Sequence, residues 1–206
     1  MTVAAGYEHY DIQDEDPYLI PGSTCLINSL GITDTQLLNE AEEKISAAAY
    51  AELIQSPAVP TFDLHHLCLI HQRLFGDIYP WAGIPRYTEI AKGGVLFLPY
   101  RLIEPKAIEV FDDLHAENLL RDLPIADFAT RAGYFLARIN AMHPFREGNG
   151  RTQRILLDQL AELSGFAFAW SAISGEKMAM ACRAARQHEE DFNKLSHLLR
   201  LHIMLI

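Results

Sequence analysis

Helical spacing of apolar residues along most of the 206-residue chain is the feature that most limits its possible folds. Leu37, Ala41, Ile45, Ala48 and Leu53 share one face of a helix, and similar runs recur as far as the C-terminus. Capping residues and breakers set the predicted limits. The predicted helices begin at a Thr33 cap and end at Ser56-Pro57, run from an Asp63 cap to Gly76, and cover about 101–120, the apolar run 128–139, 149–164, 174–190 and 191–205.

One clear β-hairpin signal interrupts this helical pattern. Strand-like residues over Arg86–Ala91 and Val95–Leu98 flank Gly93-Gly94, which suits a two-residue turn with positive φ. The predicted fold is therefore mainly α with one small hairpin, which excludes a doubly wound sheet and a Rossmann nucleotide site. Residues 1–32 are predicted to be an irregular N-terminal arm, and 33–206 a single helical domain.

Charge is distributed unevenly. The net charge is −10, and residues 1–63 carry 11 acidic residues against the single basic Lys44. This acidic region is interpreted as a solvated face, or alternatively as a lobe that attracts a basic partner. The acidic balance argues against a general binder of nucleic acid or of anionic membranes.

Other sequence features favour a cytoplasmic protein. The three cysteines form no C-x-x-C pair, as expected for reduced thiols. No signal peptide is recognisable, and the longest uncharged stretch, 17–33, contains two prolines and two glycines, so a membrane helix is not expected.

The segment from His143 to Arg151 carries the chemistry. Gly148 and Gly150 bracket Asn149 directly before a predicted helix, and a glycine-rich turn at a helix N-terminus binds anions through unpaired N–H groups and the helix dipole. Arg151 and Arg154, three residues apart, are expected on one side of the first turn, where guanidinium groups grip phosphate oxygens.

A carboxylate and a base complete this set. Glu147 suits Mg²⁺ bound to a nucleotide, and His143 has a side chain that accepts protons near neutral pH. Each feature alone is common in proteins without such a site, but together they describe phosphoryl or nucleotidyl transfer.

The segment His-Pro-Phe-Arg-Glu-Gly-Asn-Gly-Arg-Thr-Gln-Arg, 143–154, resembles the signature of the Fic family, His-Pro-Phe-x-(Asp/Glu)-Gly-Asn-Gly-Arg-x-x-Arg, at every specified position. Weaker similarities extend outward. Asp16-Pro17-Tyr18 with Pro21-Gly22 resembles the family's N-terminal arm, and Trp81-Ala82-Gly83 with Arg86 and the Gly93-Gly94 hairpin resembles its flap.

The resemblance implies a mainly helical enzyme that moves AMP from ATP onto a hydroxyl of a target protein. His143 would take the proton from that hydroxyl, and Glu147 would hold Mg²⁺ between the α- and β-phosphates. Phe145 would point into the core and anchor the loop. Arg146 occupies the family's variable position and is assigned no role.

The same resemblance implies roles for the rest of the motif. Asn149 and the backbone at Gly148 and Gly150 would cradle the phosphates. Arg151 and Arg154 would bind the β- and γ-phosphates and neutralise the leaving charge.

The hairpin has a possible role of its own, because a two-stranded ribbon leaves an edge with which an extended target segment can pair. The alternative is a purely structural hairpin. The candidate docking residues are Ile90, Ala91, Lys92, Gly93, Gly94, Val95 and Leu96.

Regulation is suggested by a motif that the sequence lacks. Many Fic proteins carry an inhibitory (Ser/Thr)-x-x-x-Glu-(Gly/Asn) helix whose glutamate pairs with the second motif arginine, here Arg154. Glu precedes Gly or Asn only at Glu117 and Glu147, and neither has Ser or Thr four residues earlier. The chain thus resembles toxins of toxin–antitoxin pairs, with a small antitoxin supplying the glutamate and the ATPase subunits of DNA gyrase and topoisomerase IV as targets.

Several alternatives stay open. A Fic-fold kinase or phosphocholine transferase would keep the fold, although Gly148, Gly150 and Arg151 favour AMP transfer. A non-catalytic module that binds ATP or a partner would have lost His143 or Glu147 first. A metal site at His65, His66, Cys68 and His71 is weighed against ordinary packing. Packing is favoured because His66 and His71, five residues apart, do not share a helix face well, although His65 and Cys68, three apart, do.

Overall fold

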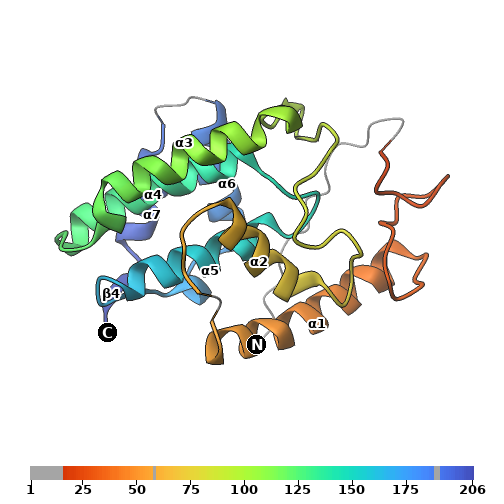
Figure 1. Cartoon of the computed structure of the whole chain (residues 1–206), viewed down its shortest axis with the longest axis horizontal. Helices are drawn as coiled ribbons and strands as arrows, with labels where there is room; N and C mark the ends of the chain where they lie inside the picture. The colour runs from red at the N-terminus through yellow and green to blue at the C-terminus, as the bar shows by residue number, and fades with distance from the viewer. Residues whose placement is uncertain (1–15, 58, 188–190) are drawn as a thin grey trace.

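The computed structural model describes residues 16–57, 59–187 and 191–206. These residues form seven α-helices, three short 3₁₀ turns and two small two-stranded sheets (Figure 1), so the predicted mainly α fold is confirmed. The helices are α1 (Thr35–Gln55), α2 (Leu64–Phe75), α3 (Ile103–Ala116), α4 (Ile125–Met142), α5 (Asn149–Glu162), α6 (Gly175–Gln187) and α7 (Asn193–Arg200); the 3₁₀ turns are η1 (Tyr100–Leu102), η2 (Asn118–Leu120) and η3 (Trp170–Ala172). The strands are β1 (Ala91–Lys92), β2 (Val95–Leu96), β3 (Phe166–Phe168) and β4 (Ile203–Leu205).

Helix caps follow local side-chain chemistry. Asp63 caps α2 by accepting a hydrogen bond from the His66 N–H at 2.7 Å, and Gly76 ends that helix, both as predicted. The cap of α1 is Asp34 rather than the predicted Thr33, because the Asp34 carboxylate accepts the Leu37 N–H at 2.9 Å.

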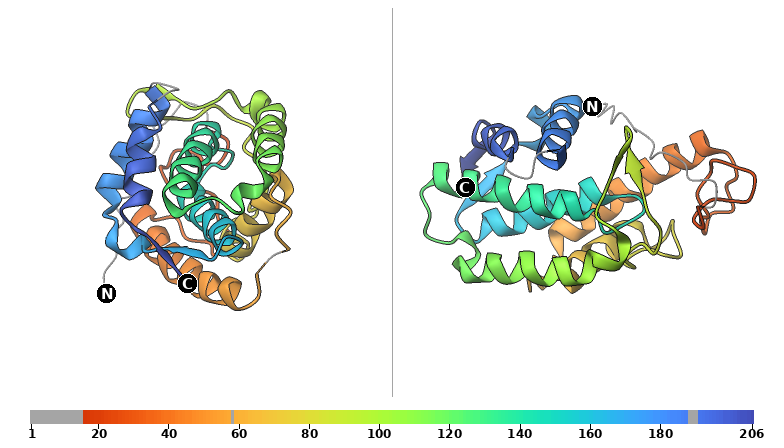
Figure 2. Two further views of the ribbon diagram at one scale, coloured as in Figure 1. Left: turned by 90° about the vertical axis from the view of Figure 1, so that its left-hand side faces the viewer. Right: turned by 90° about the horizontal axis from the view of Figure 1, so that it is seen from above.

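Helices α4 and α5 lie at the centre of the molecule. In the left view of Figure 2 they are surrounded by α1, α2 and α3 on one side and by α6 and α7 on the other. Helix α4 buries ten of its 18 residues, as expected for a helix covered on several sides. Helix α7 packs closely against it at Gly133, where a Cβ would lie 2.4 Å from the Ser196 hydroxyl.

The predicted hairpin is present but short. Ala91 pairs with Leu96 and Lys92 with Val95, and both glycines of the turn have positive φ (60° and 73°). The predicted strands, 86–91 and 95–98, were too long. Beyond the two pairs, the Phe97 N–H donates to the Ile90 carbonyl at 3.0 Å, and the Arg86 guanidinium donates to the carbonyls of Thr88 and Leu98.

A second small sheet was not predicted. Strand β3 pairs antiparallel with β4, and the predicted helix over 191–205 therefore ends at Arg200. Phe166 and Phe168 both point into the core, which fixes β3 against the helices. Gly165, with φ of 73°, permits the turn out of α5.

The described part of the N-terminal arm belongs to the same core as the helices. Tyr18 and Cys25 are fully buried in it, and Asn28 holds the arm's turn by donating to the carbonyls of Leu26 and Ile32. Residues 1–15 of the predicted arm lie outside the described residues. All three cysteines are free thiols, and no helix in the described ranges has the length and apolar character needed to cross a membrane.

Candidate active site

The loop between α4 and α5 is shaped by two residues with left-handed backbone. His143 ends α4 with φ of 45°, and Gly148 precedes α5 with φ of 80°. Gly148 is sterically required, because a Cβ there would lie 2.4 Å from the Phe75 ring. Phe145, which the resemblance assigns as the anchor of the loop, is fully buried.

Asn149 closes this loop with its side chain. Its Oδ1 accepts the Phe145 N–H at 2.9 Å, and its Nδ2 donates to the Phe145 carbonyl at 2.7 Å. Both ends of the amide are therefore engaged within the loop. Asn149 was expected to help cradle the phosphates, and in the structure its side chain fixes the shape of the loop.

His71 of α2 contacts the loop and holds it in place. Its Nδ1 accepts the Gly83 N–H at 2.8 Å, which leaves Nε2 to donate to the Glu147 carbonyl at 2.9 Å, and its ring stacks on Phe145. Burial lowers the pKa of His71 to about 3, so the imidazole is neutral in this role. Both ring nitrogens of His71 are therefore engaged by backbone groups, so this side chain positions the motif loop.

Arg86 connects the hairpin to the motif. Its side chain is fully buried, its Nε donates to the His143 carbonyl at 2.9 Å, and its backbone N–H donates to the Pro144 carbonyl at 2.7 Å. The sequence marked Arg86 only by resemblance. Its hydrogen bonds link the flap to the backbone of the candidate base.

His143 is arranged as a neutral base. Its Nδ1 lies 3.1 Å from the Asn140 carbonyl, so Nδ1 carries the proton and the basic lone pair is on Nε2. Its ring stacks on Phe97 at 3.8 Å, and Arg186 covers the far face of Phe97. Burial holds the pKa of His143 well below 6.5, and the charges of Arg86, Lys92 and Arg186 lower it further, against the hydrogen bond to Asn140.

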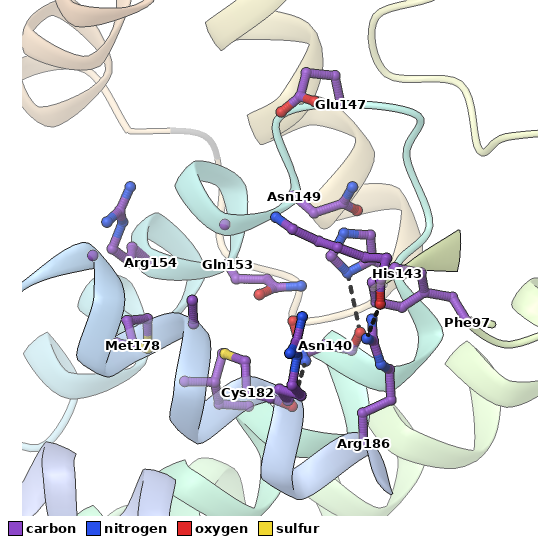
Figure 3. A pocket seen from close by; sticks show the side chains of 16 residues that line it. Phe97, Asn140, His143, Glu147, Asn149, Gln153, Arg154, Met178, Cys182 and Arg186 are labelled. Carbon is purple, nitrogen blue, oxygen red and sulfur yellow. Dashed lines mark hydrogen bonds between the residues drawn. The ribbon is translucent and has the colours of Figure 1, made fainter. Parts of the chain in front are cut away.

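A pocket opens beside His143, between the motif, the flap and α6 (Figure 3). Four residues of α5 face it at positions i, i+1, i+4 and i+5, which is one face of a helix. The α5 residues are Asn149, Gly150, Gln153 and Arg154; the others include Lys92, Phe97, Leu136, Asn140, His143, Glu147, Gly175, Met178, Ala179, Cys182, Arg183 and Arg186.

The two motif arginines point to different places. Arg154 lines the pocket and, within the described residues, forms no ion pair or hydrogen bond; burial lowers its pKa. Arg151 does not line the pocket. It binds Glu42 and Ser46 of α1 and lies over the Phe75 ring. Three residues advance a helix by about 300°, so the directions of Arg151 and Arg154 differ by about 60°. This difference is enough to turn Arg151 toward α1.

Arg146, to which the sequence assigned no role, forms a buried ion pair with Asp16 of the arm at 2.8 Å. Together with the Glu42–Arg151 pair, it brings two acidic residues of the N-terminal region into contact with the motif. The acidic excess of residues 1–63 is therefore not only a solvated face.

Comparison with known proteins agrees with this geometry. The Fic/DOC family model matches residues 61–161. The protein adenylyltransferase VbhT of Bartonella schoenbuchensis is 39% identical over 81% of this chain and 35% of its own length. The probable protein adenylyltransferase Fic of Salmonella typhimurium is 37% identical over 82% of this chain and 84% of its own. The chain belongs to the Fic/DOC family.

Solved Fic structures share the fold. BepC of Bartonella tribocorum, determined with bound AMPPNP, superimposes with a TM-score of 0.85 at 27% identity over 92% of this chain and 97% of its own. A Fic domain from Bartonella quintana with bound ADP also reaches 0.85, at 27% identity over 92% of this chain and 95% of its own. These Fic relatives support nucleotidyl transfer as the reaction class, with ATP as co-substrate.

Only part of the predicted docking segment, residues 90–96 of the flap, is exposed to solvent. Ile90 and Ala91 are buried, whereas Gly93, Gly94 and Leu96 are exposed. Lys92 and Val95 are half-buried, and Lys92 lines the pocket. The Arg183 guanidinium lies directly against Gly93, where a Cβ would come within 2.3 Å of it.

Glu147 fits the expected role of a magnesium ligand. Its carboxylate lines the pocket, is about a quarter exposed, and accepts the Gly148 N–H at 2.9 Å through Oε1. Mg²⁺ in nucleotide sites is commonly held by one or two carboxylates with phosphate oxygens and water. A single partly exposed carboxylate beside a phosphate cradle meets that requirement.

Proposed function

We propose that this protein transfers AMP from ATP to a hydroxyl group of a target protein. The observation that carries the proposal is the state of His143: a neutral ring that lines the pocket, with Nδ1 hydrogen-bonded to the Asn140 carbonyl, so that the basic lone pair is on Nε2. A histidine that acts as a general base must be neutral and within reach of the proton that it removes.

In this mechanism Nε2 of His143 takes the proton of the acceptor hydroxyl. The acceptor oxygen attacks the α-phosphorus of ATP, the bond from that phosphorus to the bridging oxygen breaks, and pyrophosphate leaves. The stack on Phe97 and the hydrogen bond to Asn140 hold the His143 ring during the transfer.

The start of α5 holds the phosphates. The Gly150 N–H lies in the first turn of α5, where helix N–H groups lack partners within the helix and an anion is favoured, whereas the Gly148 N–H is held by the Glu147 carboxylate. Arg154, buried along the same wall, neutralises the far phosphates and the developing charge of pyrophosphate. Glu147 would hold Mg²⁺, which would supply positive charge to neutralise the phosphates.

In this proposal Arg151 does not bind the phosphates, although the sequence predicted that it would. Its contacts with Glu42 and Ser46 make it a support for the start of α5 rather than a phosphate ligand. The exposed part of the flap, Gly93 to Leu96, accepts the target segment by strand pairing.

The decisive experiment uses ATP labelled once at the α-phosphate and once at the γ-phosphate, with Mg²⁺ and a bacterial lysate. We expect an α-labelled protein band that His143→Ala abolishes and that His65→Ala, a control on exposed α2 surface, leaves unchanged. A γ-labelled band would instead show kinase chemistry. Label transferred only from CDP-choline would show phosphocholine transfer, and ATP binding with no transfer would show a binding module.

We further propose that the protein is a cytoplasmic toxin whose targets are the ATPase subunits of DNA gyrase and topoisomerase IV. Its support is the absence from the sequence of the inhibitory motif, and an Arg154 that forms no ion pair within the described residues. A small antitoxin would supply the missing glutamate to Arg154. Neither nucleic acid nor membrane is part of this proposal.

Two measurements test this finer proposal. Purified gyrase and topoisomerase IV ATPase subunits should take up the α-label, and growth should stop on expression of the wild type but not of His143→Ala. A short protein that co-purifies and blocks labelling should lose its effect when its glutamate is replaced by glycine. No label on either subunit would refute the target.

A further inference from the structure

Gln153 has a buried hydrogen-bond donor without a partner. Its side chain is only 4% exposed, and its amide nitrogen makes no hydrogen bond to any of the described residues. It nevertheless lines the pocket, one helical turn beyond Asn149 and directly before Arg154. A buried, unpaired N–H destabilises the fold. The Gln159 amide on the same helix is also buried and unpaired, but of these two glutamines only Gln153 lines the pocket.

Arg154 is the one cation labelled directly beside Gln153 in Figure 3, although Lys92, Arg183 and Arg186 also line the pocket. Figure 3 shows the Gln153 amide in the middle of the pocket, between Arg154 on one side and His143 on the other, with Asn140 and Cys182 below it. The Asn140 amide is already directed to the Cys182 carbonyl, at 3.4 Å. Met178 and Leu136 add apolar surface to the same pocket.

These neutral groups differ from the phosphate end of the pocket. The phosphate end has backbone N–H groups at the start of α5 and the Arg154 cation. A neutral amide beside thioether, thiol and aliphatic groups suits a neutral acceptor, such as a sugar oxygen or a ring nitrogen of a base.

We propose that the Gln153 amide N–H binds the nucleoside half of ATP, as a donor to a neutral acceptor on the ribose or the adenine. This inference rests on the proposed function only in taking ATP as the pocket's ligand. Gln153 then determines nucleotide affinity, and the bound nucleotide supplies the hydrogen bond that the protein does not.

Replacement of Gln153 by methionine tests this with two readouts that move in opposite directions. Gln153→Met keeps the side-chain length and removes the unpaired donor, so the melting temperature without nucleotide should stay the same or rise by about 2–4 °C. Calorimetric titration with Mg²⁺ and ATP should show a Kd raised by about 3–10-fold, the effect of one lost hydrogen bond. If the role of Gln153 were merely structural, the melting temperature of Gln153→Met without nucleotide would fall.

The matched control is Gln159→Met, the same replacement on the same helix outside the pocket lining; it should leave the Kd for ATP unchanged. Inorganic tripolyphosphate is the second probe, and its Kd should be equal in wild type and Gln153→Met. An equal loss for tripolyphosphate would overturn the assignment to the nucleoside, and an unchanged Kd for ATP would overturn the contact itself. If Gln153→Met does not fold, Gln153→Leu replaces it with the same expectations.

The wild-type titration separates this inference from the proposed function. If wild type binds no ATP, the proposed function fails, whatever the variants do. If wild type binds ATP and Gln153→Met binds it equally well, only the role of Gln153 fails.

Discussion

The pair formed by Glu42 of α1 and Arg151 of the motif allows a quantitative test of how the active-site loop is supported. The Glu42 side chain is 1% exposed and accepts hydrogen bonds from both Arg151 and the Tyr79 hydroxyl, while the Arg151 side chain is 22% exposed. Burial raises the pKa of Glu42, and the charge of Arg151 opposes that rise. The pair therefore depends on both partners being present.

Removal of one partner leaves the other as a buried, uncompensated charge. Breaking a buried pair in this way typically costs about 3–5 kcal/mol, whereas neutralising both partners is far less costly. Because Arg151 is partly exposed, we expect Glu42→Gln to lose about 3 kcal/mol, and Arg151→Gln, which leaves the more buried charge, to lose about 3–5 kcal/mol. The double variant should lose much less than the sum, with a coupling energy of at least about 2 kcal/mol.

Urea unfolding at pH 7, followed by circular dichroism, measures these losses. With a slope of about 1–3 kcal/mol per molar urea, a loss of 3 kcal/mol lowers the midpoint by about 1–3 M. Glu40→Gln, on the exposed face of the same helix, is the control and should change stability by less than about 0.5 kcal/mol. Additive losses in the double variant, or single losses as small as the control's, would refute the reasoning.

The same variants separate support from phosphate binding. Arg151→Gln should weaken ATP binding much less than Arg154→Gln, because only Arg154 lines the pocket. Equal losses in ATP affinity, measured by calorimetry under conditions where both variants are folded, would return Arg151 to the phosphate site.

Three further predictions concern the loop. Because burial holds the pKa of His143 well below 6.5, the acid limb of kcat/KM against pH should have its midpoint below 6.5; a midpoint at or above 6.5 would contradict the buried base. The pKa of His71 is about 3 in the fold and about 6.5 when unfolded, so the unfolded state binds more protons in that window and stability falls as pH falls through it. Urea titrations should show a slope smaller by up to about 1.4 kcal/mol per pH unit in His71→Gln, and an unchanged slope would count against a neutral buried ring. Gly148→Ala should cost more than about 2 kcal/mol through its positive φ and the clash with Phe75, whereas Gly150→Ala, with open space at its Cβ, should keep or raise the melting temperature while weakening ATP binding; similar stabilities for the two variants would contradict this.

Local chemistry in the sequence determined most of the fold. The Asp63 cap, the Gly76 stop and the Gly93-Gly94 turn depend on residues a few positions apart, and the structure confirms each of them. The motif 143–154 was visible for the same reason, because a glycine-rich turn before a helix is a local pattern. The burial of Phe145 was expected only from the resemblance of the motif to the Fic signature.

The error in the first helix cap was small, because Thr33 and Asp34 are adjacent and both can cap. The missed sheet was larger: β3 and β4 are separated by more than thirty residues, and their pairing depends on α6 and α7 bringing the two segments together. Alternation over three residues is too short a signal to distinguish a strand from the end of a helix.

The supports of the site were decided by the tertiary structure. Asp16 with Arg146, Glu42 with Arg151, and His71 with the Glu147 carbonyl join positions 76 to 130 residues apart. No periodicity records such contacts, since each depends on which helix faces are brought together when the core forms. The sequence by itself located the segment at the start of α5 that lines the pocket. The packing of α1, α2 and the arm around that helix decided that Arg151 supports the loop while Gln153 and Arg154 face the pocket, because neighbouring positions on a helix point in different directions.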